Sequence, residues 1–583
     1  MKNFSEVRDN MLIEWDVPVK MRDGVTLRCD VFRPNDQNGK YPVLLSYGPY
    51  GKGLAFQEGY PDSWIAMVHK FPDVAYGSSN KYQSWEVADP EKWVPDGYVL
   101  VRFDSRGAGN SPGFFQPFSK IEAQDIYECI EWSGIQPWSS GKVGMSGISY
   151  YAVNQWMAAA LRPPHLAACC IWEGFCDHYR DSIRHGGILS TFFEEWFEMQ
   201  CFKIQHGKGD YGLKSRVTGE NVSGDETLTP VQLAENRMDY RAELSDSHVI
   251  DKKYFNDRIS SPEKIEVPLL SCGNWGGQGL HLRGNTEGYL AAGSQEKYLE
   301  IHGHEHWTGY YTDYGVNLQK KFFGHYLKGE STGWDKQPSV QLQIRYPGEQ
   351  FVERCEDAWP IPRTKWTPYY INAQNPELSQ DKPASAQKIS FDALGEGVNF
   401  MSAPFEKDTE ITGPISAKLT VSSSTTDADL FLVLRLFDDN MGEVTFSGAC
   451  DPHQPIAQGW LRASHRKLDP QKSLPYRPWH THDEVSLLTP KEKYELDIEI
   501  WPTCIVLPKG YRLCLSVRGK DYIYPHVPSG SDISHFKTPM TGCGPFVHKD
   551  PVDRNKKVFS GTTTLHIDPQ NPSYILLPVI PEK

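Results

Sequence analysis

Residues 142–152, KVGMSGISYYA, decide the fold class of this chain. An apolar run of strand character leads into Gly147, and the residues after Ser149 have the composition of a buried helix. A strand that enters a tight, glycine-flanked turn and then a helix is the geometry of a nucleophile elbow, which lifts a serine hydroxyl into a cleft. The backbone N–H after that serine and the N-terminus of the helix stabilise an oxyanion. The segment therefore predicts Ser149 as a nucleophile.

The elbow motif is incomplete, because Tyr151 stands where the common G-x-S-x-G pattern has its second glycine. On the motif alone, an ordinary strand–helix turn that contains a serine explains the residues equally well. Ser146 is a competing nucleophile, but it lies within the expected strand rather than at the start of the helix. Ser149 is therefore preferred, and its assignment depends on partners elsewhere in the chain.

Short apolar runs bounded by Gly, Pro and Asp surround this segment, and helical patterns lie between the later ones. Such alternation predicts an α/β fold class with a largely parallel sheet. We expect strands at residues 25–32, 42–47, 98–103, 165–172, 267–272 and 297–301, and helices at residues 121–133, 151–161 and 317–327.

Three changes in the sequence pattern divide the chain into four segments. The α/β pattern covers residues 1–177 and 262–344, and a Trp- and Phe-rich helical insertion at residues 178–261 separates the two parts. From residue 345 to 583 short alternating segments are split by Gly, Pro, Asp and Ser turns. This last pattern is typical of an all-β sandwich.

Composition limits the partners of the chain. Its 583 residues include 60 Lys and Arg against 74 Asp and Glu, which gives a formal net charge of −14. An acidic balance argues against nucleic acid as a partner, because phosphate binding needs a basic surface. No apolar stretch approaches the length of a membrane span, so no membrane partner is expected. A homodimer is compatible with the sequence.

The twelve cysteines favour a cytoplasmic protein. Cys169, Cys170 and Cys514 lie inside apolar runs, where buried free thiols are expected, and no pair has CxxC spacing. The first nine residues, MKNFSEVRD, lack the apolar core of a signal peptide. These features favour a compartment in which thiols stay reduced.

A histidine cluster follows the expected strand at residues 297–301. His302, His304 and His306 alternate along the loop, and a serine nucleophile needs an imidazole base that a carboxylate orients. Both His304 and His306 are candidates for this imidazole base. Alternate histidines also suit a metal ion, but no companion carboxylate motif supports this, so no metal and no cofactor are expected.

Seven motifs, spread over nearly the whole chain, together point to one known family. They are MRDGVTLRCDVFRP (residues 21–34), SYGPYGK (46–52), FDSRGAGNSPG (103–113), QPWSSGKVGMSGISY (136–150), GPISAKLTVSSSTTDADL (413–430), GWLRASHRKLD (459–469) and VLPKGYRLCLSV (506–517). With these motifs the chain resembles the CocE/NonD family of cocaine-esterase-like hydrolases, which are relatives of X-Pro dipeptidyl peptidases and α-amino-acid ester hydrolases. The resemblance implies an α/β-hydrolase domain with a helical cap insertion, followed by a C-terminal all-β jelly-roll sandwich.

The resemblance also implies roles for individual residues. Ser149 matches the nucleophile, although Ala152 stands where the family has a glycine. The Tyr150 N–H and the Tyr50 hydroxyl match the two donors of the oxyanion hole. His306 fits the position of the family base better than His304, which remains the runner-up.

The triad acid departs from the family pattern. Gly276 occupies the position of the family Asp, so either the triad is incomplete or the acid comes from elsewhere. Glu173 is the preferred substitute, because it ends the strand after the nucleophile's helix and neighbouring parallel strands deliver side chains to one sheet edge. The alternative for Glu173 is an ion pair with an arginine of the cap. Glu305 and Glu287 are the runner-up acids.

Two tryptophans are candidates for the substrate pocket: Trp275, near the expected acid position, and Trp172, next to Glu173. The aromatic residues of the insertion are at helical spacing, so we expect most of them to pack in the core.

These features predict a serine hydrolase that cleaves a small-molecule ester or amide through an acyl-enzyme intermediate. An acyltransferase that passes the same acyl group to an alcohol or amine is one alternative. A non-catalytic binding protein on a hydrolase scaffold is another, and the absent Asp at Gly276 is the feature in its favour. A peptidase of the X-Pro type is less favoured.

Overall fold

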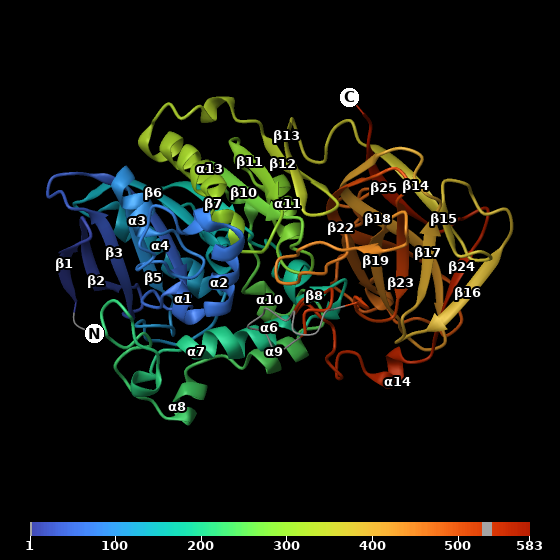
Figure 1. Cartoon of the computed structure of the whole chain (residues 1–583). Helices are drawn as coiled ribbons and strands as arrows, with labels where there is room; N and C mark the ends of the chain where they lie inside the picture. The colour runs from blue at the N-terminus through green and yellow to red at the C-terminus, as the bar shows by residue number, and fades with distance from the viewer. Residues whose placement is uncertain (1–2, 527–538, 583) are drawn as a thin grey trace.

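The computed structural model describes residues 3–526 and 539–582, and two large sheets form the two lobes of Figure 1. Within the described residues, the first sheet has eleven strands in the order β1-β2-β3-β5-β4-β6-β7-β10-β11-β12-β13. In chain order these are β1 (Phe4–Arg8), β2 (Met11–Lys20), β3 (Thr26–Pro34), β4 (Tyr41–Gly48), β5 (Val99–Asp104), β6 (Ser139–Ile148), β7 (Leu166–Trp172), β10 (Leu269–Asn274), β11 (Lys297–His302), β12 (Val340–Tyr346) and β13 (Gln350–Glu356).

The central strands, from β5 through β12 in sheet order, run parallel and carry helices on both faces. Successive strand residues point to opposite faces. Val43 of β4 packs in one core with Ile126 of α4, whereas Leu44 packs in another with Phe323 of α13. The predicted α/β fold class is thereby seen in the first lobe. Its longer helices are α2 (Pro61–Lys70), α4 (Lys120–Gly134), α5 (Tyr150–Ala159), α11 (Leu282–Ala291) and α13 (Asp313–Phe323), and its shorter ones are α1 (Phe56–Gly59), α3 (Pro90–Trp93) and α12 (Thr308–Tyr311).

Residues 178–261 form a helical segment that runs along the lower side of Figure 1, from α8 below the first sheet to α6 and β8 near the second. The side chains of Phe192, Phe193, Trp196 and Phe197 are buried in the same core as Leu44 of the sheet, as expected for a packing role. The segment contains β8 (Arg184–His185), β9 (Ile188–Leu189), α6 (Phe192–Trp196), α7 (Phe202–Ile204), α8 (Pro230–Glu235), α9 (Tyr240–Asp246) and α10 (Lys253–Asn256).

The second lobe is a β-sandwich or barrel, and its sheet has twelve strands within the described residues. Alternate residues of these strands, such as Ile415, Leu432 and Ile498, fill a core of their own. The strands are β14 (Lys365–Asn372), β15 (Glu377–Ser379), β16 (Gln387–Asp392), β17 (Val398–Ser402), β18 (Thr409–Ser423), β19 (Asp429–Phe437), β20 (Glu443–Val444), β21 (Ala457–Arg462), β22 (Tyr494–Leu507), β23 (Arg512–Arg518), β24 (Thr562–Ile567) and β25 (Tyr574–Ile580), and α14 (Lys556–Phe559) lies beside them.

The domain boundary expected between residues 344 and 345 is wrong. It falls inside β12, which pairs in parallel with β11 of the first sheet and forms an antiparallel hairpin with β13. The first lobe therefore extends to Glu356. The error has a physical reason: β12 lies near the sheet edge and is buried at alternate positions, a pattern also typical of a sandwich strand.

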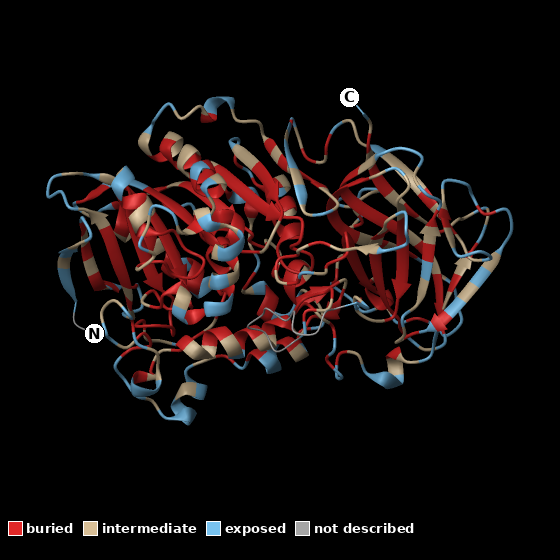
Figure 2. Ribbon diagram, viewed as in Figure 1, coloured by how far each residue is buried: buried red, intermediate tan, exposed pale blue. Residues whose placement is uncertain are grey.

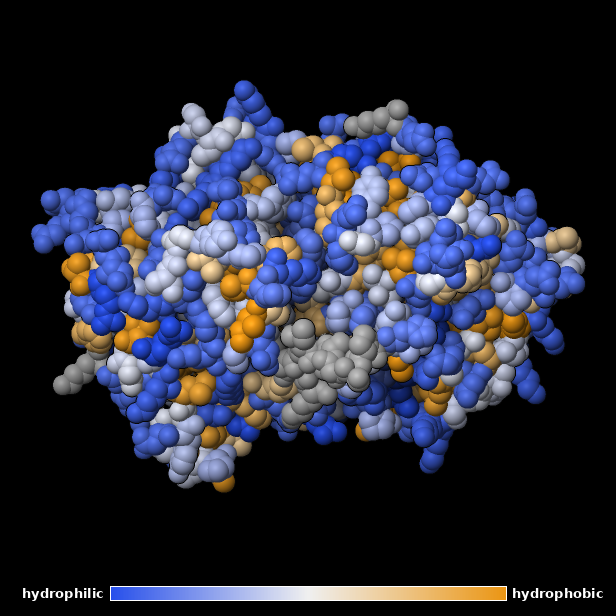
Figure 3. Space-filling model, viewed as in Figure 1, coloured by the Kyte–Doolittle hydropathy of each residue, from blue (hydrophilic) through white to orange (hydrophobic). Residues whose placement is uncertain are grey.

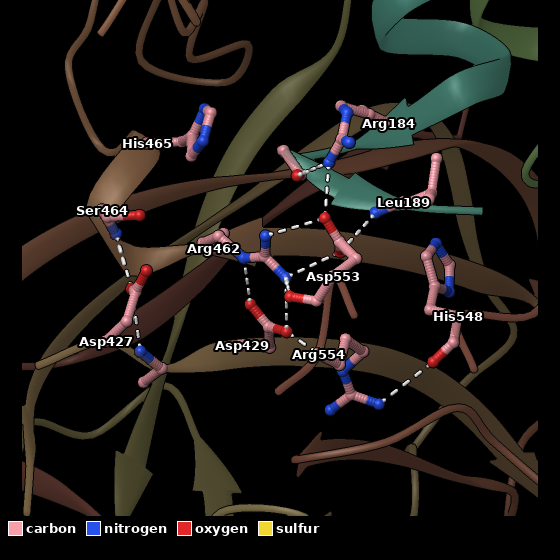
Figure 4. Close-up of polar contacts among 12 residues, drawn as sticks. Arg184, Leu189, Asp427, Asp429, Arg462, Ser464, His465, His548, Asp553 and Arg554 are labelled. Atoms are coloured by element: carbon pink, nitrogen blue, oxygen red, sulfur yellow. Dashed lines mark hydrogen bonds and ion pairs between the residues drawn. The ribbon is translucent and has the colours of Figure 1, made fainter. Parts of the chain in front are cut away.

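A buried network of ion pairs joins the helical segment to the second lobe (Figure 4). Arg184 of β8 donates to Asp553 at 2.7 Å, and Asp553 also accepts from Arg462 at 2.9 Å. Arg462 in turn pairs with Asp429 at 2.8 Å, and Arg554 donates to the same carboxylate at 3.0 Å. We call these five residues the arginine cluster.

Burial follows the two sheets, whose strands are mostly buried, while exposed residues gather in loops and at outer edges (Figure 2). The face drawn in Figure 3 is largely hydrophilic, with small, separate hydrophobic patches. None of the described helices combines the length and the apolar surface that crossing a bilayer would require.

Candidate active site

Ser149 occupies a strained turn between β6 and α5. Its φ of 56° and ψ of −113° are unusual for a residue with a side chain, and such strain is typical of a functional turn. Its backbone N–H donates to the carbonyls of Trp172 and Glu173, both at 3.1 Å. Gly147 has a φ of 149°, and a Cβ there would lie 2.3 Å from the Cβ of Tyr151. The chain thus has the geometry of the predicted nucleophile elbow.

Ser146, the competing serine, lies in the buried interior of β6. Its hydroxyl is 2.8 Å from the Tyr310 hydroxyl and donates to Gln319 at 3.3 Å. These hydrogen bonds indicate a structural role for Ser146 in the strand that leads into the elbow.

The Ser149 side chain borders a narrow cavity of about 30 Å³, room for about two water molecules. Aromatic side chains from the helical segment and from the loops of the first lobe form most of its walls, and the second lobe contributes Cys450. The lining includes Phe118, Phe175, Phe192, Phe193 and Trp196, together with the polar groups of Tyr50, Glu86, His281 and His306.

The structure brings Glu173 and His306 together. Glu173 directly follows β7 with a φ of 49°, and its Oε2 accepts from His306 Nδ1 at 2.7 Å. Its other oxygen accepts from His302 Nε2 at 3.1 Å and from Asn274 Nδ2 at 3.2 Å. Burial opposes ionisation of this carboxyl, but the two histidines outweigh burial and lower its pKa. Glu173 is therefore an ionised carboxylate that orients the imidazole of His306.

A second carboxylate, Glu86, faces the other nitrogen of His306. Glu86 is buried with a φ of 62°, and its Oε1 accepts from His306 Nε2 at 3.1 Å. Burial opposes protonation of His306, but Glu173 and Glu86 together raise its pKa to about 10. Burial raises the pKa of Glu86. In the resting state His306 is thus an imidazolium between two carboxylates, and its Nε2 is directed at Glu86.

The hydrogen bond of the Ser149 side chain is to a different histidine, His281. Nε2 of His281 lies 3.1 Å from Ser149 Oγ, and its Nδ1 accepts from the Phe175 N–H at 3.1 Å. The rings of His281 and His306 are stacked, with centroids 5.2 Å apart and planes 17° apart. Burial, with the charge of His306 beside it, lowers the pKa of His281 well below its ordinary value.

Of the two predicted oxyanion donors, Tyr50 lines the same cavity as Ser149, and Tyr150 is the next residue along the chain. The Tyr50 hydroxyl accepts from Trp196 Nε1 at 3.0 Å, so its own proton is directed elsewhere, and burial raises its pKa well above the ordinary value. The backbone N–H of Tyr150 belongs to the first turn of α5. The Tyr150 phenol donates to Glu122 at 2.6 Å. The geometry thus supplies a phenol and a helix N-terminus at the cavity.

The runner-up residues have other partners. His304 packs between Phe71 and Phe351, and burial lowers its pKa to about 4. Glu305 pairs with Lys70 at 2.7 Å. Glu287, on α11, pairs with Arg477 at 3.0 Å. Among the described residues, no group of three or more His, Cys, Asp or Glu side chains is arranged to hold a metal ion.

A steric reason accounts for the glycine at the family's Asp position. A Cβ on Gly276 would lie 2.4 Å from the Cα of Gly448, which belongs to a loop of the second lobe. The same loop donates the Ala449 N–H to the Gly276 carbonyl at 2.9 Å. Because this loop fills the space, no aspartate side chain fits there, and Glu173 from the neighbouring strand is the carboxylate that reaches the imidazole.

The pocket role expected for the two tryptophans needs correction. Trp275 is fully buried between the lobes and donates to the Gln343 carbonyl at 2.7 Å. Trp172 is fully buried as well and lies against the ring of His302, with centroids 5.0 Å apart. Neither is part of the cavity lining, because the side chain of Trp172 in β7 and that of Trp275 in the turn after β10 each pack into a core.

Sequence reasoning missed His281 and Glu86. His281 is a lone histidine in the loop before α11, and Glu86 lies in a loop before α3 with no motif around it. The glycines that precede His281 were a signal for a tight loop at the sheet edge, but they did not indicate the direction of its side chain.

A strained serine at the edge of a parallel sheet, an imidazole held by a carboxylate and a buried phenol define a serine hydrolase. Comparison with known proteins agrees. Residues 23–308 match the family model of the X-Pro dipeptidyl-peptidase (S15 family), and residues 332–576 match the X-Pro dipeptidyl-peptidase C-terminal non-catalytic domain. The chain belongs to the CocE/NonD family of hydrolases, which confirms the predicted family and enzyme class.

Three relatives illustrate the match. A CocE/NonD family hydrolase from Staphylococcus aureus is 31% identical with a TM-score of 0.83, and the alignment covers 100% of this chain and 96% of that one. Cocaine esterase from Rhodococcus sp. is 25% identical over 98% of this chain and 100% of its own length. An α-amino acid ester hydrolase shares the fold, with 17% identity, a TM-score of 0.67 and coverage of 99% and 98%. The relatives support the predicted serine hydrolase and neither the acyltransferase nor the binding-protein alternative.

Proposed function

We propose that this protein hydrolyses a small-molecule ester or amide through an acyl-enzyme on Ser149. The observation that carries the proposal is the strained Ser149 in an aromatic cavity, beside a carboxylate-held imidazole and the Tyr50 phenol. The names of two relatives, cocaine esterase and α-amino acid ester hydrolase, support an ester as the substrate.

The reaction begins when His306 releases Glu86. The proton on His306 Nε2 passes to Glu86, whose pKa burial raises, and the imidazole turns its free nitrogen toward Ser149. Nε2 then takes the hydroxyl proton while Oγ attacks the carbonyl carbon, and Glu173 holds the proton on Nδ1. The new imidazolium afterwards gives its proton to the leaving alcohol or amine.

The oxyanion of the tetrahedral intermediate accepts hydrogen bonds from the Tyr50 hydroxyl and the Tyr150 N–H. Because Trp196 donates to the Tyr50 oxygen, the phenolic proton stays available for the oxyanion. Each such donor is worth about 2.7–4 kcal/mol of barrier. Water, activated by His306, then attacks the acyl-enzyme and releases the acid.

The helical segment, residues 178–261, acts as a cap over the cavity, and the second lobe is a jelly roll. Phe192, Phe193 and Trp196 of the cap narrow the cavity from one side, and Cys450 of the second lobe borders it from another. A cavity of about 30 Å³ with these walls favours a compact, apolar acyl group.

A fluorophosphonate probe tests the proposal, because it reacts with activated serines. We expect one adduct, on Ser149, in the folded protein. We expect Ser149→Ala to abolish the adduct and to lower ester hydrolysis by at least about 10⁴-fold. Absence of labelling in the wild-type protein, with its unfolding transition intact, would refute the proposal.

A further inference from the structure

Two histidines line the cavity together with Ser149, and the proposed mechanism uses only His306. The other, His281, is buried and contacts the reacting atom directly, with its Nε2 3.1 Å from Ser149 Oγ. A hydrogen bond between an imidazole and a nucleophilic serine usually identifies the general base. The surroundings of His281 indicate a different role.

The protonation of His281 follows from its second contact. The Phe175 backbone N–H donates to Nδ1 at 3.1 Å, so Nδ1 presents its lone pair. A neutral imidazole with a lone pair on Nδ1 carries its proton on Nε2. Nε2 therefore donates to Ser149 Oγ and has no lone pair with which to take the serine proton.

The environment also keeps His281 neutral. The ring of the His306 imidazolium is stacked against it, with centroids 5.2 Å apart, and a second positive charge at this distance is unfavourable. The His281 ring also stacks on Phe175, with centroids 5.7 Å apart and planes 12° apart. Protonation of Nδ1 would also bring its N–H against the N–H of Phe175. His281 is thus a fixed hydrogen-bond donor.

We propose that His281 is a catalytic residue that donates a hydrogen bond to Ser149 Oγ whenever this oxygen carries negative charge. The inference rests on the proposed function. Oγ becomes negative twice, when it attacks the substrate and when it leaves the acyl-enzyme as water replaces it. The Nε2–H of His281 stabilises both transition states, and its proton stays on the imidazole throughout. Proton transfer remains the task of His306.

Two substitutions separate this role from a structural one. In His281→Asn the side-chain oxygen lies near the place of Nδ1 and still accepts from Phe175, but no donor reaches Ser149. In His281→Gln the amide nitrogen reaches the place of Nε2 and still donates to Ser149, but the acceptor for Phe175 is lost. Each of the two substitutions therefore removes only one of the two hydrogen bonds of His281.

The measurement is the pre-steady-state burst and the steady-state rate with 4-nitrophenyl acetate, together with thermal unfolding. A hydrogen bond to a charged atom corresponds to about 10- to 100-fold in rate. We expect His281→Asn to slow both acylation and deacylation by that factor, and His281→Gln to lose clearly less. Equal losses in the two variants, or rates of His281→Asn equal to wild type, would overturn the inference.

The pH dependence of kcat/KM and the reaction of Ser149 with the fluorophosphonate distinguish the donor role of His281 from the alternatives. Because His281 does not titrate in the proposed mechanism, His281→Asn keeps the acidic midpoint of kcat/KM. Loss of that midpoint would identify His281 as the base and refute its role as a donor. If the wild-type protein fails to react with the fluorophosphonate, the proposed function and this inference fall together. If the wild type reacts and His281→Asn is unimpaired, only this inference falls.

Discussion

Two clusters of buried charge in this molecule look alike by burial and differ in chemistry. One is the arginine cluster between the helical segment and the second lobe (Figure 4). The other, which we call the catalytic cluster, consists of Glu86, His306, Glu173, His302 and Glu300. Burial of charge alone therefore does not identify an active site.

The arginine cluster is built from guanidinium and carboxylate groups that pair at close range. Burial opposes ionisation of Asp553, but Arg462 and Arg184 outweigh burial and hold its pKa well below the ordinary range. None of the five residues of the cluster has a positive φ. Fixed charges on an unstrained backbone fit a structural connection between two parts of the chain.

The catalytic cluster is built from imidazoles and carboxylates, between which a proton can move. Burial opposes protonation of His302, but Glu300 and Glu173 raise its pKa to about 9. The backbone has positive φ at Glu86 and Glu173 of the cluster and at Ser149 beside the cluster, and Glu86 and His306 border the cavity. Groups that exchange protons, a strained backbone and an opening together distinguish this cluster from the other.

The largest effect on the rate of ester hydrolysis should come from Glu173, the carboxylate that His302 and His306 share. We expect Glu173→Gln to lower ester hydrolysis by about 10³- to 10⁴-fold, because the amide no longer stabilises the His306 imidazolium that forms during attack. The measurement is kcat/KM per folded molecule, with folding checked by thermal unfolding.

Two matched carboxylates serve as controls for this substitution. Glu305 pairs with Lys70 at the surface, and Glu287 pairs with Arg477 away from the cavity. We expect Glu305→Gln and Glu287→Gln to leave kcat/KM of the folded enzyme close to wild type. Near-normal turnover in Glu173→Gln, or a loss in Glu305→Gln as large as the one predicted for Glu173→Gln, would show that the acid is assigned to the wrong residue.

The second effect concerns stability and comes from the arginine cluster. Asp553→Asn leaves Arg184 and Arg462 buried with less compensating charge, which typically costs about 3–5 kcal/mol. We expect a lower midpoint of urea unfolding and little change in kcat/KM of the folded fraction. Glu266→Gln, which breaks the exposed pair with Arg162, should cost less than about 1 kcal/mol. An unfolding midpoint of Asp553→Asn equal to that of Glu266→Gln would contradict the structural role.

Local sequence patterns could be predicted from the sequence, whereas contacts between residues far apart in the chain could not. Strand–helix alternation and the elbow at Ser149 are local patterns, so the first lobe and the nucleophile were accessible. Glu173 was accessible because its strand neighbours that of the nucleophile. The steric conflict at Gly276 was hidden, because it depends on Gly448, which lies far away in sequence.

Side-chain direction accounts for the remaining misses. Trp275 follows the strand that was expected to carry the acid, yet its indole turns into the core between the lobes. His281 and Glu86 face the cavity from loops without a periodic pattern, so neither burial nor orientation could be predicted. Placement of an element follows from sequence pattern more readily than the direction of a single side chain in a loop.

The smallest effect, and the sharpest test of proton exchange in the catalytic cluster, is expected from Glu86→Gln. Glu86 lies 3.1 Å from His306 Nε2 and stabilises the charged imidazolium, so its removal lowers the pKa of His306. The base must be neutral to take the serine proton, and a lower pKa makes it neutral at lower pH. The acidic limb of kcat/KM should therefore move to lower pH, by about one to three units.

The plateau value of kcat/KM at high pH should change much less in Glu86→Gln than in Glu173→Gln, because in Glu86→Gln the Glu173 carboxylate still orients the His306 imidazole. The rate of fluorophosphonate labelling against pH provides a second readout, and it should shift by the same amount, since both reactions need the same neutral base. An unchanged midpoint in both profiles would mean that Glu86 does not share a proton with His306. In that case the catalytic cluster would resemble the arginine cluster, with charges fixed in place, and the release of His306 from Glu86 would drop out of the mechanism.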